Sequence, residues 1–271
     1  MTWIDPISRA LHHQAGQHGP VMLMYHAVTP GKDAPAWPWA VSIQQFRDQL
    51  DFLASEGYET PTMAELVAAP AKKWPGRTAV ITFDDGYADN LAACEELQKR
   101  GMRATWFIVS GSVGQPPHWP EDGRPTGRML NADELREMQA SGMEIGSHTV
   151  SHMRLTELDD AQLTQELTLS KGTLEALLGN AVGSFAYPYG DWDARCAAAV
   201  KQAGYTAACT TCTGWALRDN DPYRLRRLTV FNNDTLSMFV RNLCFGDNQT
   251  TFSKLLRYQF SRFAHIFSPR T

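Results

Sequence analysis

The sequence predicts an α/β fold in which helices cover a parallel sheet that is either open or closed as a barrel. Short apolar or β-branched runs alternate with amphipathic helical patterns along the chain. The chain has 271 residues, of which 43% are hydrophobic and 20% charged, and a barrel of this kind needs roughly 250 residues. One large domain with a well-filled core therefore fits the length.

The expected elements follow one another in strand–helix order. Strands are expected at short apolar or β-branched runs, which occupy residues 21–25, 78–83, 104–109, 143–146, 184–188, 207–211 and 228–231. Helices are expected where apolar residues recur on one face, at residues 42–56, 88–99, 132–140, 159–178 and 193–202. Gly57 and Gly101 end the first two helices, and Asn131 with Glu134 forms a capping box at the third.

Charge and hydropathy argue against several classes of protein. The net charge is only −4 and no basic face dominates the body of the chain, so a nucleic-acid partner is not expected. No run of about 18 apolar residues is present, which predicts no membrane span. The first twenty residues carry acid and histidine where a signal peptide needs a basic patch and an apolar run. We therefore expect a cytoplasmic protein.

The five cysteines are odd in number and irregularly spaced, which argues against a disulfide framework. Cys209 and Cys212 form a single C-x-x-C in an apolar, β-like neighbourhood. Without a second pair, two buried or free thiols are favoured over a redox or zinc site.

Two adjacent carboxylates, Asp84 and Asp85, end the strand at 78–83 and precede Gly86. At a junction between strand and turn both side chains can reach one pocket, although Asp-Asp-Gly is also a common turn. Two like charges in one pocket are costly unless a cation or a shared proton relieves them. This segment alone leaves both interpretations open.

His148 and His152 follow the strand at 143–146. Histidines at positions i and i+4 fall on one face of a helical turn, close enough to share a metal, although such a pair also occurs by chance. Combined with Asp84 and Asp85, the pair changes the interpretation. Two imidazoles and one carboxylate are typical of a catalytic metal site with an open position for water, and the second carboxylate remains as a base.

A third polar segment follows another apolar strand. Its Tyr187-Pro188-Tyr189-Gly190 turn can present a backbone N–H and an aromatic wall, and it is equally typical of a structural turn. In this order, the three segments resemble the polysaccharide deacetylase family, also called NodB-homology domains or family 4 carbohydrate esterases. The similarity covers about residues 20–245. It implies a distorted (β/α) barrel with fewer than eight strands.

The resemblance also implies an activity, the removal of acetyl from an N-acetylated amino sugar. Asp85, His148 and His152 would hold a divalent ion, usually zinc although other transition metals serve. Asp84 would be the general base for the attacking water. The ion and the backbone N–H of Tyr189 would stabilise the oxyanion that forms on the carbonyl oxygen when water adds to the acetyl carbon.

Two features of the family are missing. Ala186 stands where the third motif usually carries an arginine that orients the base, and the C-terminal Leu-x-His that supplies the general acid is absent. However, the run from Leu23 to His26 resembles the opening of a circularly permuted branch that includes bacterial poly-N-acetylglucosamine deacetylases. His26 is therefore the candidate acid, with a structural histidine as the alternative.

A replacement for the missing arginine is expected near the strand at 228–231. Arg227 directly precedes that strand and could pair with Asp84, with Arg224 and Arg226 as alternatives.

Several residues beside the motifs could touch the sugar. Tyr87 and Trp192 flank motifs and could stack on sugar rings, although simple packing explains them equally well. The segment 111–128 is too irregular for a tight loop and could shape access to the site, and its His118 is expected to be a solvated loop residue.

The last twenty-one residues differ in composition from the body of the chain. Residues 251–271 combine aromatic and aliphatic side chains with lysine and arginine and contain no acid. Such a segment is typical of an amphipathic helix on an anionic membrane, which would suit a lipid-linked glycan, or of a helix that docks on the barrel.

We therefore divide the chain into an extension at 1–19, a deacetylase domain at 20–250 and this tail. O-deacetylation of a glycan, hydrolysis of a small amide and a catalytically impaired sugar-binding module are the alternative functions.

Overall fold

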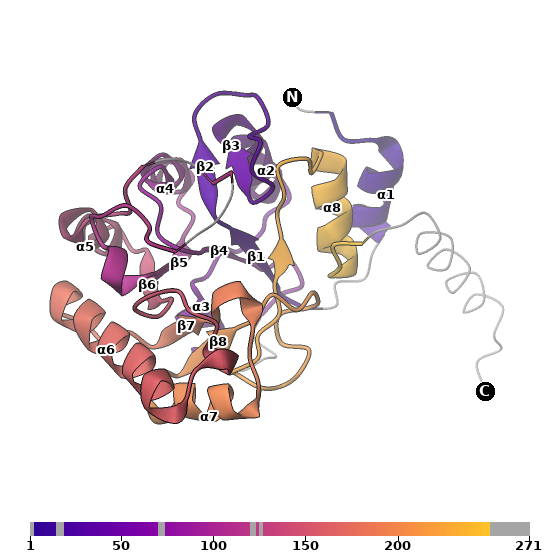
Figure 1. Cartoon of the computed structure of the whole chain (residues 1–271). Coiled ribbons are helices and arrows are strands. Elements are labelled where there is room, and N and C mark those ends of the chain that lie inside the picture. The colour runs from indigo at the N-terminus through magenta and orange to yellow at the C-terminus, as the bar shows by residue number, and fades with distance from the viewer. Residues whose placement is uncertain (1–2, 15–18, 70–73, 120–122, 125–126, 250–271) are drawn as a thin grey trace, which may run out of the picture.

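A computed structural model describes residues 3–14, 19–69, 74–119, 123–124 and 127–249 (Figure 1). Seven parallel strands form one curled sheet in the order β8-β7-β6-β5-β4-β1-β9. These strands are β1 (Val21–Tyr25), β4 (Ala79–Phe83), β5 (Ala104–Ile108), β6 (Glu144–Ser147), β7 (Ser184–Ala186), β8 (Ala207–Cys209) and β9 (Leu228–Thr229). The expected α/β barrel with fewer than eight strands is confirmed.

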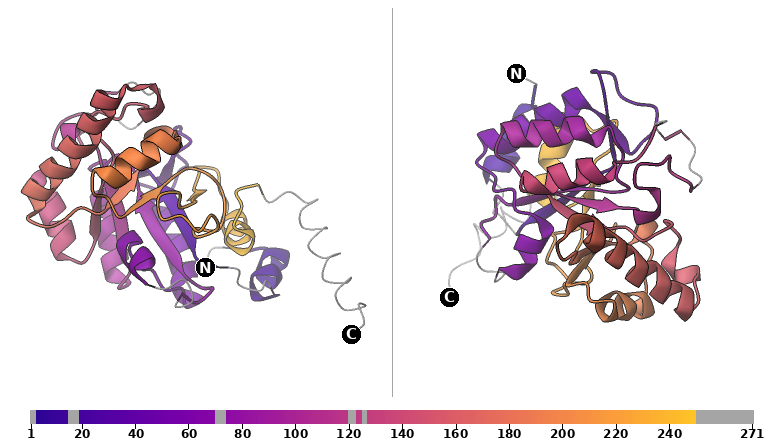
Figure 2. Two further views of the ribbon diagram at one scale, coloured as in Figure 1. Left: turned by 90° about the horizontal axis from the view of Figure 1, so that it is seen from below. Right: turned by 90° about the vertical axis from the view of Figure 1, so that its left-hand side faces the viewer.

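Helices surround the outside of the curled sheet (Figures 1 and 2). The five helices that the sequence predicted are α2 (Ile43–Ser55), α4 (Asn90–Lys99), α5 (Ala132–Ala140), α6 (Asp160–Leu178) and α7 (Ala194–Gln202). The capping box expected at the start of α5 is present. The elements not predicted are α1 (Pro6–Gln14), α3 (Met63–Ala68), α8 (Leu236–Phe245), and a small parallel pair, β2 (Ala27–Thr29) with β3 (Ala40–Ser42).

Alternate residues of β1, β4, β5, β7 and β8 belong to two different apolar clusters, as the pleat of a strand requires. Leu23, Ile81 and Trp106 belong to the larger cluster, which contains the inward faces of the helices. Met22 and Phe107 point to the inside of the curl, where α3 adds apolar side chains. The backbone N–H groups at the start of α3 bond to side chains of β5 and β6, so α3 covers the amino ends of the strands. The carboxyl ends remain open for a site.

The segment before β9 connects the two edges of the sheet. Leu225 pairs with Cys209 of β8, and three residues later Leu228 pairs with Leu23 of β1. This bridge explains why a residue between them, Arg227, is completely buried.

Both cysteines of the C-x-x-C have free thiols, Cys209 buried and Cys212 exposed.

The first helix packs on the last described one, so the two ends of the described chain lie side by side (Figure 1). The Asp5 carboxylate is 3.1 Å from the Arg241 guanidinium of α8. The backbone N–H of Asp5 donates to the hydroxyl of Ser237 on the same helix. Within the described ranges, no helix has both the length and the hydropathy to cross a bilayer. The amphipathic tail expected at 251–271 lies outside the described residues.

Candidate active site

A cavity of about 390 Å³ opens at the carboxyl ends of the strands, where parallel α/β folds place their chemistry. Segments that are far apart in the chain supply its wall. The lining residues are Met24, His26, Trp39, Asp84, Asp85, His148, His152, Arg154, Tyr189, Gly190, Thr211 and Thr229. The cavity therefore contains the four residues that the sequence assigned to the centre.

Asp84 and Asp85 directly follow β4, and each is only 2% exposed. The backbone N–H of Asp84 donates to the carbonyl of Tyr25 at 3.0 Å, which extends the pairing of β1 with β4. Asp85 then adopts the left-handed region with φ of 72°. Because the chain turns there, both carboxylates line one cavity instead of pointing to opposite faces of the sheet.

His148 and His152 lie on an irregular loop after β6, so the helical turn expected between them is wrong. Thr149 and His152 have left-handed φ angles of 69° and 59°. The backbone N–H of His152 donates to Thr149 Oγ1 at 2.9 Å, which folds the loop back on itself. Both rings reach the cavity through this local turn and not through helical periodicity.

Three ligand atoms from Asp85, His148 and His152 lie within 4.8 Å of one another, and all three side chains are buried. Asp85 Oδ1 is 3.6 Å from Nε2 of His148 and 3.3 Å from Nε2 of His152. Asp85 Oδ1 has no hydrogen-bond partner among the described residues. A buried carboxylate oxygen of this kind needs a cation or a proton donor.

The tautomer of His148 makes this ring a possible metal ligand and not a proton donor to Asp85. Nδ1 of His148 is 2.8 Å from the carbonyl oxygen of Ala186, and a carbonyl can only accept, so Nδ1 carries the proton. Burial lowers the pKa of His148 to about 4, which leaves the ring neutral near pH 7. Its Nε2 lone pair then faces the Asp85 carboxylate. Two nitrogens and one oxygen so placed fit a divalent ion such as Zn²⁺.

Arg227 forms an ion pair with the carboxylate of Asp84 through two hydrogen bonds. Its Nη1 and Nη2 donate to Oδ1 and Oδ2 of Asp84 at 2.6 and 2.8 Å, and its Nε donates to the carbonyl of Thr210. The two side chains are 0% and 3% exposed. Burial opposes ionisation of Asp84, but the Arg227 guanidinium outweighs it and holds the pKa of that carboxyl below its ordinary value.

The other two candidate arginines lie elsewhere. Arg226 pairs with Asp219 at 2.7 and 3.0 Å, and the Arg224 guanidinium lies 4.5 Å from the ring centre of Trp192. Ala186, at the place of the family's usual arginine, is completely buried. The guanidinium beside Asp84 therefore comes from Arg227, in the segment that bridges the two edges of the sheet.

Tyr189 lies in the turn after β7 with φ of 59° and is 42% exposed at the cavity. A Cβ on the next residue, Gly190, would collide with Thr211 Oγ1, so only glycine fits there. The turn is therefore fixed in a shape that holds the Tyr189 backbone at the wall of the cavity.

His26 directly follows β1 and is half-buried in the cavity wall, with its ring edge-to-face to Trp37 at 5.8 Å. Burial lowers the pKa of His26, although Asp85 and Asp84 act in the opposite direction. Its Nδ1 has no hydrogen-bond partner among the residues described. The His26 ring therefore lies in the wall of the same cavity as Asp84 and Asp85.

Two suggested sugar contacts are not in the cavity wall. Tyr87 is 4% exposed and packs against Trp37, which leaves no ring face for a sugar. Trp192 is half-buried between Tyr187 and Arg224. Packing explains both positions.

Sequence reasoning missed two residues at the mouth of the cavity, Trp39 and Arg154. Trp39 is 37% exposed, and the Arg154 guanidinium stacks on the Tyr189 ring at 4.3 Å. Trp119 belongs to the segment 111–128, which was expected to shape access to the site, and its ring stacks on the His152 ring at 4.6 Å. No local pattern in the sequence placed Trp39 or Arg154 at the site.

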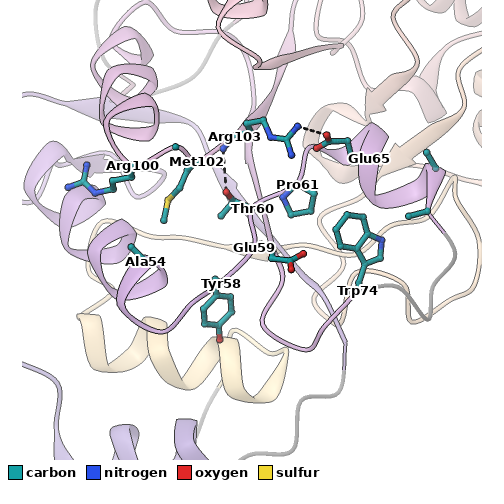
Figure 3. A pocket seen from close by; sticks show the side chains of 13 residues that line it. Ala54, Tyr58, Glu59, Thr60, Pro61, Glu65, Trp74, Arg100, Met102 and Arg103 are labelled. Atoms are coloured by element: carbon teal, nitrogen blue, oxygen red, sulfur yellow. Dashed lines mark hydrogen bonds and ion pairs between the residues drawn. The ribbon is translucent and has the colours of Figure 1, made fainter.

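A larger hollow of about 840 Å³ lies at the opposite ends of the strands, beside Tyr58 and Trp74 (Figure 3). Its two arginines are already engaged, Arg100 with Asp51 and Glu96, and Arg103 with Glu65. Size alone therefore does not locate the chemistry, because convergent titratable groups are found in the smaller cavity.

Fold and cavity together define an α/β barrel with a candidate hydrolytic centre. The polysaccharide deacetylase family model matches residues 71–208. YxkH of Bacillus subtilis, named as a polysaccharide deacetylase, is 32% identical over 212 residues, which are 77% of this chain and 70% of YxkH. The poly-β-1,6-N-acetyl-D-glucosamine N-deacetylase of Staphylococcus epidermidis is 26% identical over 75% of this chain and 72% of its own length.

Solved structures agree with these relatives. The deacetylase PplD of Streptococcus pyogenes, in complex with acetate, has a TM-score of 0.71 at 26% identity, over 83% of this chain and 98% of its own. IcaB of Ammonifex degensii has a TM-score of 0.69 at 25% identity, over 83% and 97%. The chain belongs to the polysaccharide deacetylase family, whose members deacetylate acetylated sugar polymers.

Proposed function

We propose that this protein removes acetyl groups from N-acetylated amino sugars of a glycan and that it needs a divalent metal ion, most readily Zn²⁺. The observation that carries the proposal is the buried Asp85–His148–His152 cluster beside the Asp84–Arg227 pair. Similarity to an N-deacetylase of poly-N-acetylglucosamine supports an amide as the bond that is cleaved.

The roles follow from the positions of the side chains. A divalent ion held by Asp85, His148 and His152 would supply Lewis-acid chemistry, polarising the acetyl carbonyl and acidifying water. Asp84 takes a proton from the attacking water, while Arg227 keeps both carboxylate oxygens in a fixed orientation. Water adds to the acetyl carbon, the C–N bond breaks, and acetate and a free amine leave.

Two further groups complete the proposed reaction. The backbone N–H of Tyr189 stabilises the oxyanion, and His26 gives its proton to the leaving amine. The exposed ring of Trp39 at the cavity mouth offers a flat apolar surface to a sugar ring.

The first test is acetate release from N-acetylglucosamine oligomers, with and without removal of metal by a chelator. Because the ion held by Asp85, His148 and His152 would supply the Lewis acid of the reaction, we expect chelation to lower activity by roughly 10²-fold or more, and added Zn²⁺ to restore it. An O-acetylated glycan serves as the comparison substrate. Activity that is indifferent to chelation would contradict metal dependence, and preference for the O-acetylated glycan would contradict N-deacetylation.

His26→Ala is expected to lower kcat by about 10²-fold without loss of bound metal, because the substitution removes a proton donor and no ligand. Acetate release and metal content are measured on the same sample. The matched control is His13→Ala, since His13 is exposed on α1. If His26→Ala loses its metal instead, His26 supports the metal site and is not the acid.

A further inference from the structure

The loop that carries both candidate histidine ligands has a strained backbone. Thr149 and His152 occupy the left-handed region. Residues other than glycine adopt that region at a cost in free energy, and a β-branched side chain such as that of Thr149 adopts it least readily. Contacts outside the loop must therefore hold it in the shape that places the two rings.

One side of the loop is held by a single carboxylate, that of Glu166 on α6. Glu166 Oε2 accepts from the backbone N–H groups of Val150 and Ser151 at 2.8 and 3.0 Å. Its Oε1 accepts from the Ser151 hydroxyl at 2.5 Å. The carboxylate thus receives three hydrogen bonds from the two residues at the centre of the loop.

The opposite side of the loop lies against the short helix η2 (Ser110–Ser112). The backbone N–H groups of Ser110 and Gly111 donate to the carbonyls of Thr149 and Val150, both at 3.0 Å. The approach is so close that a Cβ on Gly111 would lie 2.5 Å from the Val150 oxygen. Since η2 bonds the loop carbonyls and Glu166 bonds the loop N–H groups, the loop is fixed between them.

We propose that Glu166 is a positioning residue for the metal centre, which keeps His148 and His152 at ligand distance from Asp85. Metal sites depend on the groups that orient their ligands, and losing such a group typically weakens binding by roughly 10–100-fold. The inference rests on the proposed function for its effect on catalysis. Its direct consequences, metal affinity and loop order, can be measured without any substrate.

The role is one of hydrogen bonding and not of charge. In Glu166→Gln, the amide oxygen can accept from both backbone N–H groups while the amide nitrogen donates to the Ser151 hydroxyl. In Glu166→Met, a side chain of similar length and helix propensity has no such acceptor. The two variants therefore separate hydrogen bonding from packing and from charge.

The experiment measures Zn²⁺ affinity of the metal-free protein by competition with a chelating dye. We expect Glu166→Met to bind Zn²⁺ roughly 10–100-fold more weakly than the wild type, and Glu166→Gln to stay within about 3-fold. The matched control is Gln165→Met on the exposed face of the same helix, which should bind as the wild type does. Thermal unfolding and circular dichroism check that each variant is folded.

Amide hydrogen exchange in the metal-free proteins is the second readout. The Val150 and Ser151 amides should exchange faster in Glu166→Met than in the wild type or Glu166→Gln, because only Glu166→Met leaves them unbonded. A folded Glu166→Met with wild-type affinity and exchange would overturn the proposal. Equal loss of affinity in Glu166→Gln would overturn it as well, because charge would then be the cause.

Failure of the proposed function would look different. A wild type that binds Zn²⁺ but releases no acetate would refute the deacetylase proposal and leave the affinity series valid. A wild type that binds no Zn²⁺ would refute the metal centre, and the exchange rates of Val150 and Ser151 would still decide whether Glu166 orders the loop.

Discussion

Asp84→Asn is expected to lower kcat/KM for acetate release by about 10²–10⁴-fold, because the amide cannot take a proton from the attacking water. Asparagine has nearly the same shape, and one of its atoms can still accept from Arg227. The three candidate ligands are unchanged, so the variant should still bind Zn²⁺. Acetate release and bound metal are measured on the same preparation.

This variant has a side effect that the measurement must separate. A neutral amide in place of the Asp84 carboxylate would leave the Arg227 charge buried without its counter-ion, so the protein should also become less stable. Activity is therefore expressed per folded, metal-loaded molecule, at a temperature below the onset of unfolding. If the folded, loaded variant released acetate at the wild-type rate, Asp84 would not be the base.

Arg227→Met is expected to lower the free energy of unfolding by about 3–5 kcal/mol, because it leaves the Asp84 carboxylate buried without a partner. The substitution should also lower kcat, since Asp84, the proposed base, loses the guanidinium that orients its carboxylate. Urea unfolding of the metal-free protein, followed by fluorescence, gives the stability change. Zn²⁺ is kept out of that measurement because bound metal would add to the stability.

Two variants control for Arg227→Met. Arg226→Met removes a neighbouring arginine whose pair with Asp219 is partly exposed, and it should cost no more than about 1 kcal/mol. The double variant Asp84→Asn with Arg227→Met removes both partners of the buried pair. It should recover most of the stability and none of the activity. If Arg226→Met and Arg227→Met lowered the free energy of unfolding equally, the prediction that removing one partner of the buried Asp84–Arg227 pair is especially destabilising would be contradicted.

The strands and helices that the sequence predicted correctly share one property. Each is long or regular enough for its hydrophobic period to appear locally, as in 79–83 with its β-branched run or 160–178 with its capping residue. The elements it missed are held by tertiary contacts. The short helix α3, for example, bonds to side chains of β5 and β6 through its first N–H groups. A six-residue helix of this kind has no period of its own to detect.

The site divides in the same way. Asp84, Asp85, His148 and His152 could be singled out because each pair lies within one short segment directly after a strand. The geometry inside those segments could not be predicted. The left-handed turns at Asp85, Thr149 and His152 run against the preference of each residue, and contacts from other parts of the fold hold them.

The sequence by itself determined the class of fold, the family resemblance and the four residues of the candidate centre, since these depend on residue types at short spacing. Only the tertiary structure selected Arg227 from three neighbouring arginines, placed Trp39 and Arg154 at the mouth, and assigned Glu166 to the histidine loop. Arg227 meets Asp84 across 143 positions of sequence because the segment from Leu225 to Leu228 bridges the two edges of the sheet. Such a contact depends on how the sheet closes, which no local pattern records.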